Sequence, residues 1–230
     1  VPAGFTIQDL VGQGFREANH IYSAMLGLWP DVKDKTNGMA RFTTIAERAK
    51  DLDLKGNLVQ DLIACFKANG TVVDPTAVVL QDLLAHEPGT PHAGFGRLFD
   101  RLPAIKLRSA LLNPDLAETA AERVRNQASF RKVLGFIREL HAAGVPVVPG
   151  TDNFPEFSLT QELALYVEAG IPAAEVLALA THGTAKVFGQ DKVTGSLEVG
   201  KRADFVLVEG DPVQDIRNLE RMVWVGKGGA

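Results

Sequence analysis

The chain has 230 residues, of which 46% are hydrophobic and 23% charged, and its formal net charge is −4. This composition can bury a sizeable core in one large domain, but it offers no basic surface for nucleic acid or an anionic membrane. No apolar run reaches the roughly 18 residues of a membrane span, and the single Cys65 excludes a disulfide framework and a cysteine metal cluster. We therefore expect a globular domain with no nucleic-acid and no membrane partner; its compartment stays open.

The chain opens on Val1 without an initiator methionine. Its first residues are typical of a loop entering a helix, with Thr6 as the N-cap. The sequence thus predicts that the chain begins inside a fold, and a missing segment or a separate partner chain would each account for this.

The first third of the chain alternates helical and strand patterns. A short helix is predicted at residues 6–14 and a strand at 15–21, which carries His20. Helices are predicted at 42–52 and 57–69, the second ended by Gly70. A strand at 71–73 then runs into Asp74-Pro75-Thr76. Strand, helix and strand in this order favour parallel βα units.

The rest of the chain continues the alternation of helices and strands and ends in a β-rich region. Residues 82–114 read as a long Gly- and Pro-containing insertion, suited to a lid or a partner surface. Long helical patterns fill 116–143, and an apolar strand at 145–152 delivers Asp152. Helices follow at 158–170, with Glu162 near the start, and at 172–188, closed by Gly189. The β-rich segments 194–208 and 222–227 end the chain.

Asp152 is the best candidate for chemistry. Ligands of α/β proteins are handled where parallel strands end, so its position favours function. Asp and Asn also cap turns, and Asp152-Asn153 fits that structural role equally well. On the local sequence alone both interpretations stay open.

Several of these residues form an ordered series of motifs. They are Gly150-Thr151-Asp152, the helix with Glu162, Ala180-Thr181 with Ala185, the run from Gly195 to Asp204, and Gly210-Asp211-Pro212. The series resembles the C-terminal half of the amidohydrolase superfamily, in its imidazolonepropionase-like and prolidase-like metal-dependent branch. The resemblance is most specific across residues 145–228.

The resemblance implies an α/β fold. Residues 1–190 would be the C-terminal part of a distorted (β/α)₈ TIM-type barrel, with 15–21, 71–74 and 145–152 as strands six to eight. Residues 191–230 would be the C-terminal strands of a small β-sandwich. Lys201 and Asp204 would then belong to a structural turn and not to an active site.

The resemblance also implies a divalent metal, with zinc as the first candidate. His20 matches the sixth-strand histidine that binds metal. Asp152 matches the eighth-strand aspartate, which binds metal and acts as general acid/base. Asn19 stands where many relatives have Glu, and the first-strand His-x-His pair, the fourth-strand bridging residue and the fifth-strand histidine are absent. Because zinc catalytic sites use three protein ligands, another part of the barrel or another copy of the chain has to complete the site.

Two functions follow as hypotheses. The first is a metal-dependent hydrolase of amide, peptide or cyclic amide C–N bonds in small molecules, in which Asp152 moves the protons of an attacking water. The second is a truncated, non-catalytic scaffold or assembly subunit that lacks a complete metal site. The substrate and the residues that bind it are not determined by the sequence.

Overall fold

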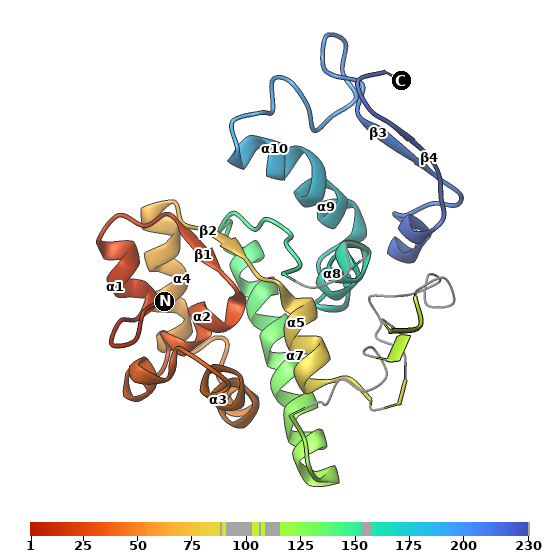
Figure 1. Cartoon of the computed structure of the whole chain (residues 1–230). Helices are drawn as coiled ribbons and strands as arrows, with labels where there is room; N and C mark the ends of the chain where they lie inside the picture. Colours follow the sequence, from red (N-terminus) through yellow and green to blue (C-terminus); the bar gives the residue numbers. More distant parts are fainter. Residues whose placement is uncertain (88, 91–102, 106, 109–115, 153–157, 230) are drawn as a thin grey trace.

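The computed structural model describes residues 1–87, 89–90, 103–105, 107–108, 116–152 and 158–229, and within them the chain is a mixed α/β protein (Figure 1). Its first half contains α1 (Ile7–Gly12), β1 (Glu17–Asn19), α2 (Ile21–Leu26), α3 (Ala40–Arg48), α4 (Asn57–Asn69), β2 (Val72–Asp74) and α5 (Ala77–Leu84). The second half contains α7 (Ala120–Ala142), α8 (Ser158–Glu168), α9 (Ala173–Ala178), α10 (Thr184–Val187), β3 (Phe205–Val208) and β4 (Met222–Gly226).

Local capping explains where several helices begin and end. Thr6 and Asp9 form a reciprocal capping box at the start of α1, and Thr119 and Glu122 form another at the start of α7. α4 ends at Gly70, whose left-handed conformation (φ 60°) closes the helix. The predicted helix at 57–69 is confirmed residue for residue.

The strands at the site are shorter than predicted. β1 stops at Asn19 because His20 turns into a left-handed conformation. Within 145–152 only Val147 forms a bridge, pairing with Val73, because Pro146 and Pro149 lack an amide hydrogen for a ladder. The predicted insertion at 82–114 begins later than expected, since α5 extends to Leu84, and most of it lies outside the described residues.

Three parallel segments form a small sheet. β1 pairs with β2, with Ala18 opposite Val73, and β2 is bridged on its other side by Val147. Val73 N donates to Pro146 O (2.8 Å), and Val148 N donates to Val73 O (2.9 Å). Because all three run in the same direction, the residues that follow them meet at one edge of the sheet.

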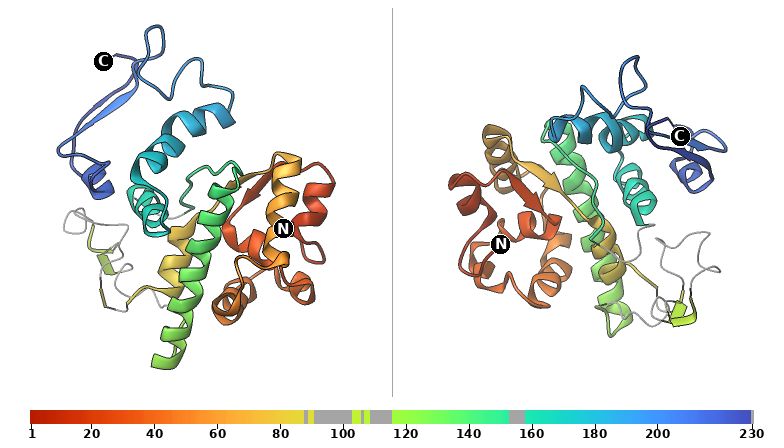
Figure 2. Two further views of the ribbon diagram at one scale, coloured as in Figure 1. Left: turned by 180° about the vertical axis from the view of Figure 1, so that it is seen from behind. Right: turned by 45° about the horizontal axis from the view of Figure 1, so that its top comes forward.

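Helices cover this sheet and build the core. α7 runs alongside α5 in both views, with α1 to α4 to one side and α8 to α10 to the other (Figures 1 and 2). The largest fully buried side chains include Phe66, Phe136 and Tyr166. α7 has 23 residues but carries charged side chains, and no helix of the described residues is long and apolar enough to cross a bilayer.

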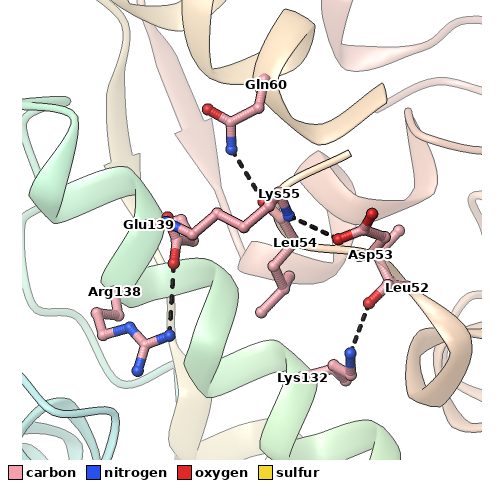
Figure 3. Close-up of polar contacts among 8 residues, drawn as sticks. All are labelled: Leu52, Asp53, Leu54, Lys55, Gln60, Lys132, Arg138 and Glu139. Atoms are coloured by element: carbon pink, nitrogen blue, oxygen red, sulfur yellow. Dashed lines mark hydrogen bonds and ion pairs between the residues drawn. The ribbon is translucent and has the colours of Figure 1, made fainter. Parts of the chain in front are cut away.

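A cluster of polar side chains attaches the loop at 52–55, which precedes α4, to helix α7 (Figure 3). Glu139 on α7 is buried and forms ion pairs with Lys55 and Arg138. About two turns earlier on the same helix, Lys132 Nζ donates to Leu52 O at 2.7 Å. These contacts hold the loop at 52–55 against α7.

The chain ends in an antiparallel hairpin of β3 and β4. Phe205 and Trp224 meet edge to face across it, with ring centroids 5.4 Å apart. Side chains on both strands are more than half exposed: Val206, Leu207, Met222, Val223, Trp224 and Val225. In the turn before it, Lys201 pairs with Glu198 and Asp204 pairs with Arg202, so Lys201 and Asp204 make separate local contacts.

Candidate active site

Strained backbone gathers at one edge of the parallel sheet. His20 (φ 65°), Thr76 (φ 47°) and Asp152 (φ 40°) are the non-glycine residues with positive φ among the described positions. Each follows one of the three parallel segments. Such conformations cost of order 1–3 kcal/mol each and cluster at functional sites. Their shared place at the carboxyl edge marks it as the candidate active site.

His20 and Asp152, 132 positions apart in the chain, face each other there. His20 Nε2 lies 3.6 Å from Asp152 Oδ2, and the two side chains are 28% and 61% exposed. On its other side His20 Nδ1 lies 2.9 Å from Thr76 Oγ1. The ring stacks on Tyr22, with centroids 5.1 Å apart and an interplanar angle of 6°. The imidazole is therefore held on three sides.

Electrostatics favour a neutral His20. Partial burial lowers the pKa of His20, the charge of Arg41 lowers it further, and the Asp152 carboxylate opposes both effects. A neutral imidazole keeps one ring nitrogen with a free lone pair, which is the form that binds a metal or accepts a proton.

The pair fits part of a metal centre. Two donors at about 2.1 Å from one tetrahedral zinc ion are about 3.4 Å apart, close to the 3.6 Å that separates His20 Nε2 and Asp152 Oδ2. Nothing else on the described part of the chain completes the set, because no group of three or more His, Cys, Asp or Glu side chains there could hold an ion. The two residues therefore suit two ligand positions and leave at least one for residues elsewhere.

Asp74, at the end of β2, adds a second carboxylate behind the pair. Burial raises the pKa of Asp74 to about 6, the charges of Glu17 and Asp152 raise it too, and the amides of Thr76 and Gly150 oppose the shift. Its Oδ1 is buried and has no hydrogen-bond partner among the described residues. A Cβ on Gly150 would come within 2.3 Å of Asp74 Oδ2, so glycine permits the two loops to approach this closely.

Replacing Gly150 with Ala is expected to lower the free energy of unfolding by about 1–3 kcal/mol, because the new methyl group displaces a buried carboxylate. Urea unfolding measures the change. Gly12→Ala is the matched control, since its added Cβ meets nothing within 4 Å. Equal effects of the two substitutions would contradict the close approach.

Glu162 on α8 is fully buried beneath the same edge. Its Oε1 accepts from Ala77 N at 2.9 Å and its Oε2 from Val78 N at 2.8 Å. Burial raises the pKa of Glu162 to about 7, although the amides of Ala77 and Val78 and the hydroxyl of Tyr166 lower it. This carboxylate connects α8 to the first turn of α5.

The raised pKa of Glu162 makes stability depend on pH. The folded chain holds this proton up to about pH 7, whereas an unfolded chain releases it near 4.5. Raising the pH across this interval therefore lowers the free energy of unfolding by up to about 3 kcal/mol, and above pH 7 the contribution stays constant. Urea unfolding of the parent and of Glu162→Gln between about pH 5 and 8 isolates the effect, because other groups cancel in the difference. Parallel pH profiles for the two proteins would contradict it.

Comparison with known proteins agrees with the resemblance seen in the sequence. The model of the amidohydrolase family matches residues 24–228. The chain belongs to the amidohydrolase family. The match covers β2, the segment with Asp152 and the C-terminal hairpin.

Relatives within and around this family differ in their named activities. The chain is 35% identical over 85 residues to 5-methylthioadenosine/S-adenosylhomocysteine deaminase of Moorella thermoacetica (32% of this chain, 20% of the relative). It is 41% identical over 75 residues to imidazolonepropionase of Geobacillus kaustophilus (30% and 18%). A crystal structure of a Xaa-Pro dipeptidase with methionine in its active site matches with a TM-score of 0.58 and 21% identity, over 97% of this chain and 41% of that one. The matches span only about a fifth of the two curated relatives.

Two residues at this edge were not predicted to belong to the site. Thr76 stood out in the sequence only as part of Asp74-Pro75-Thr76, and Glu162 only as a residue of a predicted helix. The signal for Thr76 is an Asp-Pro-Thr turn directly after a buried strand, at the edge of the sheet where Asp152 also lies. The contacts of Glu162 with α5 join residues 84 and 85 positions apart, so no local sequence pattern predicts them.

Proposed function

We propose that the protein hydrolyses amide-type C–N bonds of small molecules, with a divalent metal held in part by His20 and Asp152. The observation that carries this is the 3.6 Å approach of His20 and Asp152 at the carboxyl edge of parallel strands, in a chain of the amidohydrolase family. This is consistent with the names of similar proteins: a 5-methylthioadenosine/S-adenosylhomocysteine deaminase, an imidazolonepropionase and, in fold, a Xaa-Pro dipeptidase.

The residues divide the chemistry between them. A bound divalent ion would supply Lewis acidity toward the substrate carbonyl and toward water, and zinc suits a nitrogen and carboxylate donor set. His20 would hold this ion through Nε2. Asp152, more than half exposed, takes the proton of the attacking water and passes it to the leaving nitrogen as general acid/base.

Fold details extend this proposal. β1, β2 and the segment at Val147 would be strands six, seven and eight of a (β/α)₈ barrel, in the same spatial order. Residues 191–230, including the β3–β4 hairpin, would be the C-terminal strands of a small β-sandwich. Remaining metal ligands would come from the earlier barrel strands or from another copy.

Turnover and metal content test the function together. Dipeptides, cyclic amides and aminopurine nucleosides are offered to the protein with its full natural sequence, and bound metal is counted by mass spectrometry. We expect hydrolysis of at least one class, stoichiometric divalent metal, and loss of both on chelation. Turnover that survives complete removal of metal would overturn the proposal.

A non-catalytic scaffold is the second candidate. The observation that favours it is the lack of a third metal-binding side chain among the described residues near His20 and Asp152. Stoichiometric metal and substrate turnover by the 230-residue chain alone would eliminate it.

Association is the expected state of the 230-residue chain. Within the described residues β1 pairs only with β2, and the segment at Val147 also pairs only with β2, so both outer edges carry open backbone groups. Proteins rarely leave such edges uncovered. Size-exclusion chromatography with light scattering is expected to show a mass above 24.7 kDa, and a compact, stable monomer would contradict the expectation.

A further inference from the structure

The first turn of α5 is capped from another helix. Ala77 and Val78 are its first two residues, and their amides have no acceptor within the helix. Both donate to the carboxylate of Glu162, which α8 presents and which is fully buried. A carboxylate at this end also interacts favourably with the helix dipole.

Thr76 occupies the N-cap position of α5 but does not cap it. Threonine at an N-cap ordinarily accepts from an amide of the first turn, yet the Thr76 side chain makes no such bond. Its hydroxyl lies instead 2.9 Å from His20 Nδ1. Its left-handed backbone, unusual for a β-branched residue, directs the chain away from ordinary capping geometry.

We propose that Glu162 is a positioning residue for the site: by capping α5 in place of Thr76, it frees the Thr76 hydroxyl to hold the ring of His20. With Nε2 bound to a metal, His20 Nδ1–H would donate to Thr76 Oγ1. Among the described residues Glu162 makes no hydrogen bond or ion pair with His20 or Asp152, and it acts through the turn at 74–77. The inference rests on the proposed function in taking His20 as a site residue.

Substitutions on α8 and at position 76 distinguish a role of Glu162 in positioning His20 from a role in packing alone. Glu162→Gln keeps the side-chain shape but has one oxygen to accept from two amides. Thr76→Val removes the hydroxyl, and Thr76→Ser restores one. Glu168→Gln makes the same chemical change at an exposed position of the same helix and is the matched control.

The readout is the tautomer of His20 in the 230-residue chain, from long-range proton–nitrogen NMR of ¹⁵N-labelled histidine at about pH 8, where Glu162 is ionised. The parent, Thr76→Ser and Glu168→Gln are expected to show one dominant tautomer. Thr76→Val and Glu162→Gln are expected to lose it and show a mixture. Near-ultraviolet circular dichroism verifies folding, and Glu162→Asp, which withdraws the carboxylate by one methylene, replaces Glu162→Gln if that variant does not fold.

A parent-like ring spectrum in both the folded Glu162 variant and Thr76→Val would overturn the inference, as would a change in Thr76→Val alone. Zinc affinity of the protein with its full natural sequence gives a second measure, and Glu162→Gln is expected to weaken it by about 10–100-fold, as loss of outer-sphere support does in metal sites. A parent protein that binds no divalent ion would end the proposed function, while the ring spectra would still decide the role of Glu162.

Discussion

Replacing Asp152 with Asn is expected to lower turnover by about 10²–10⁴-fold, the range that general acid–base catalysis contributes. The amide cannot accept the proton of the attacking water. Asn has the same shape as Asp and tolerates the left-handed conformation of this position (φ 40°). The side chain is 61% exposed, so the free energy of unfolding should change by less than about 0.5 kcal/mol.

Steady-state kinetics on a substrate found in the screen, together with urea unfolding, measure both quantities. Asp61→Asn, on the exposed face of α4, is the control and should change neither. Unchanged turnover in Asp152→Asn would remove the role assigned to Asp152. A large loss of stability would mean that the carboxylate acts as a turn cap instead, the structural alternative that the local sequence left open.

Replacing Gly195 with Ala is expected to lower the free energy of unfolding by about 2–5 kcal/mol. Two penalties add: the left-handed backbone at φ 90°, costing about 1–2 kcal/mol for a residue with a Cβ, and steric overlap, costing about 1–3 kcal/mol. The added Cβ would lie 2.6 Å from Ala185 Cβ and 3.1 Å from Thr181 O. Gly195 therefore permits the turn before β3 to lie directly on α10.

Gly200→Ala supplies the matched comparison. Gly200 has nearly the same backbone (φ 91°), but nothing lies within 4 Å of its added Cβ, so only the backbone penalty applies. Urea unfolding and amide hydrogen exchange in 173–187 report the difference. If the two substitutions cost the same, the close approach of Gly195 to the helix contributes nothing to stability.

Local chemistry accounts for the parts of the fold that the sequence predicted well. Capping residues such as Thr6 and a terminal Gly70 act within a few positions, and both helix ends were confirmed. The strand at 145–152 was predicted from its apolar character and is too long, because hydrogen bonding depends on amides that Pro146 and Pro149 lack.

The sequence could nominate the residues of the candidate site but not their arrangement in space. His20 and Asp152 were nominated through the family resemblance, and their metal and proton-transfer roles stay predictions. Their approach depends on three segments pairing in parallel, which spacing along the chain does not encode. The contact of Thr76 with His20 spans 56 positions, and it exists only because α8 supplies a cap that a reading of α5 alone cannot anticipate.

The left-handed backbones of His20, Thr76 and Asp152 place activity and thermostability in conflict. Glycine at any of these positions would relieve the backbone penalty, yet it would delete an imidazole, a hydroxyl or a carboxylate from the site. At Asp152, whose side chain is mostly exposed, little packing is lost, so directed evolution that selects on melting temperature alone should accept glycine there and produce a durable, inactive protein. A screen for thermostable variants has to keep the Asp152 codon fixed.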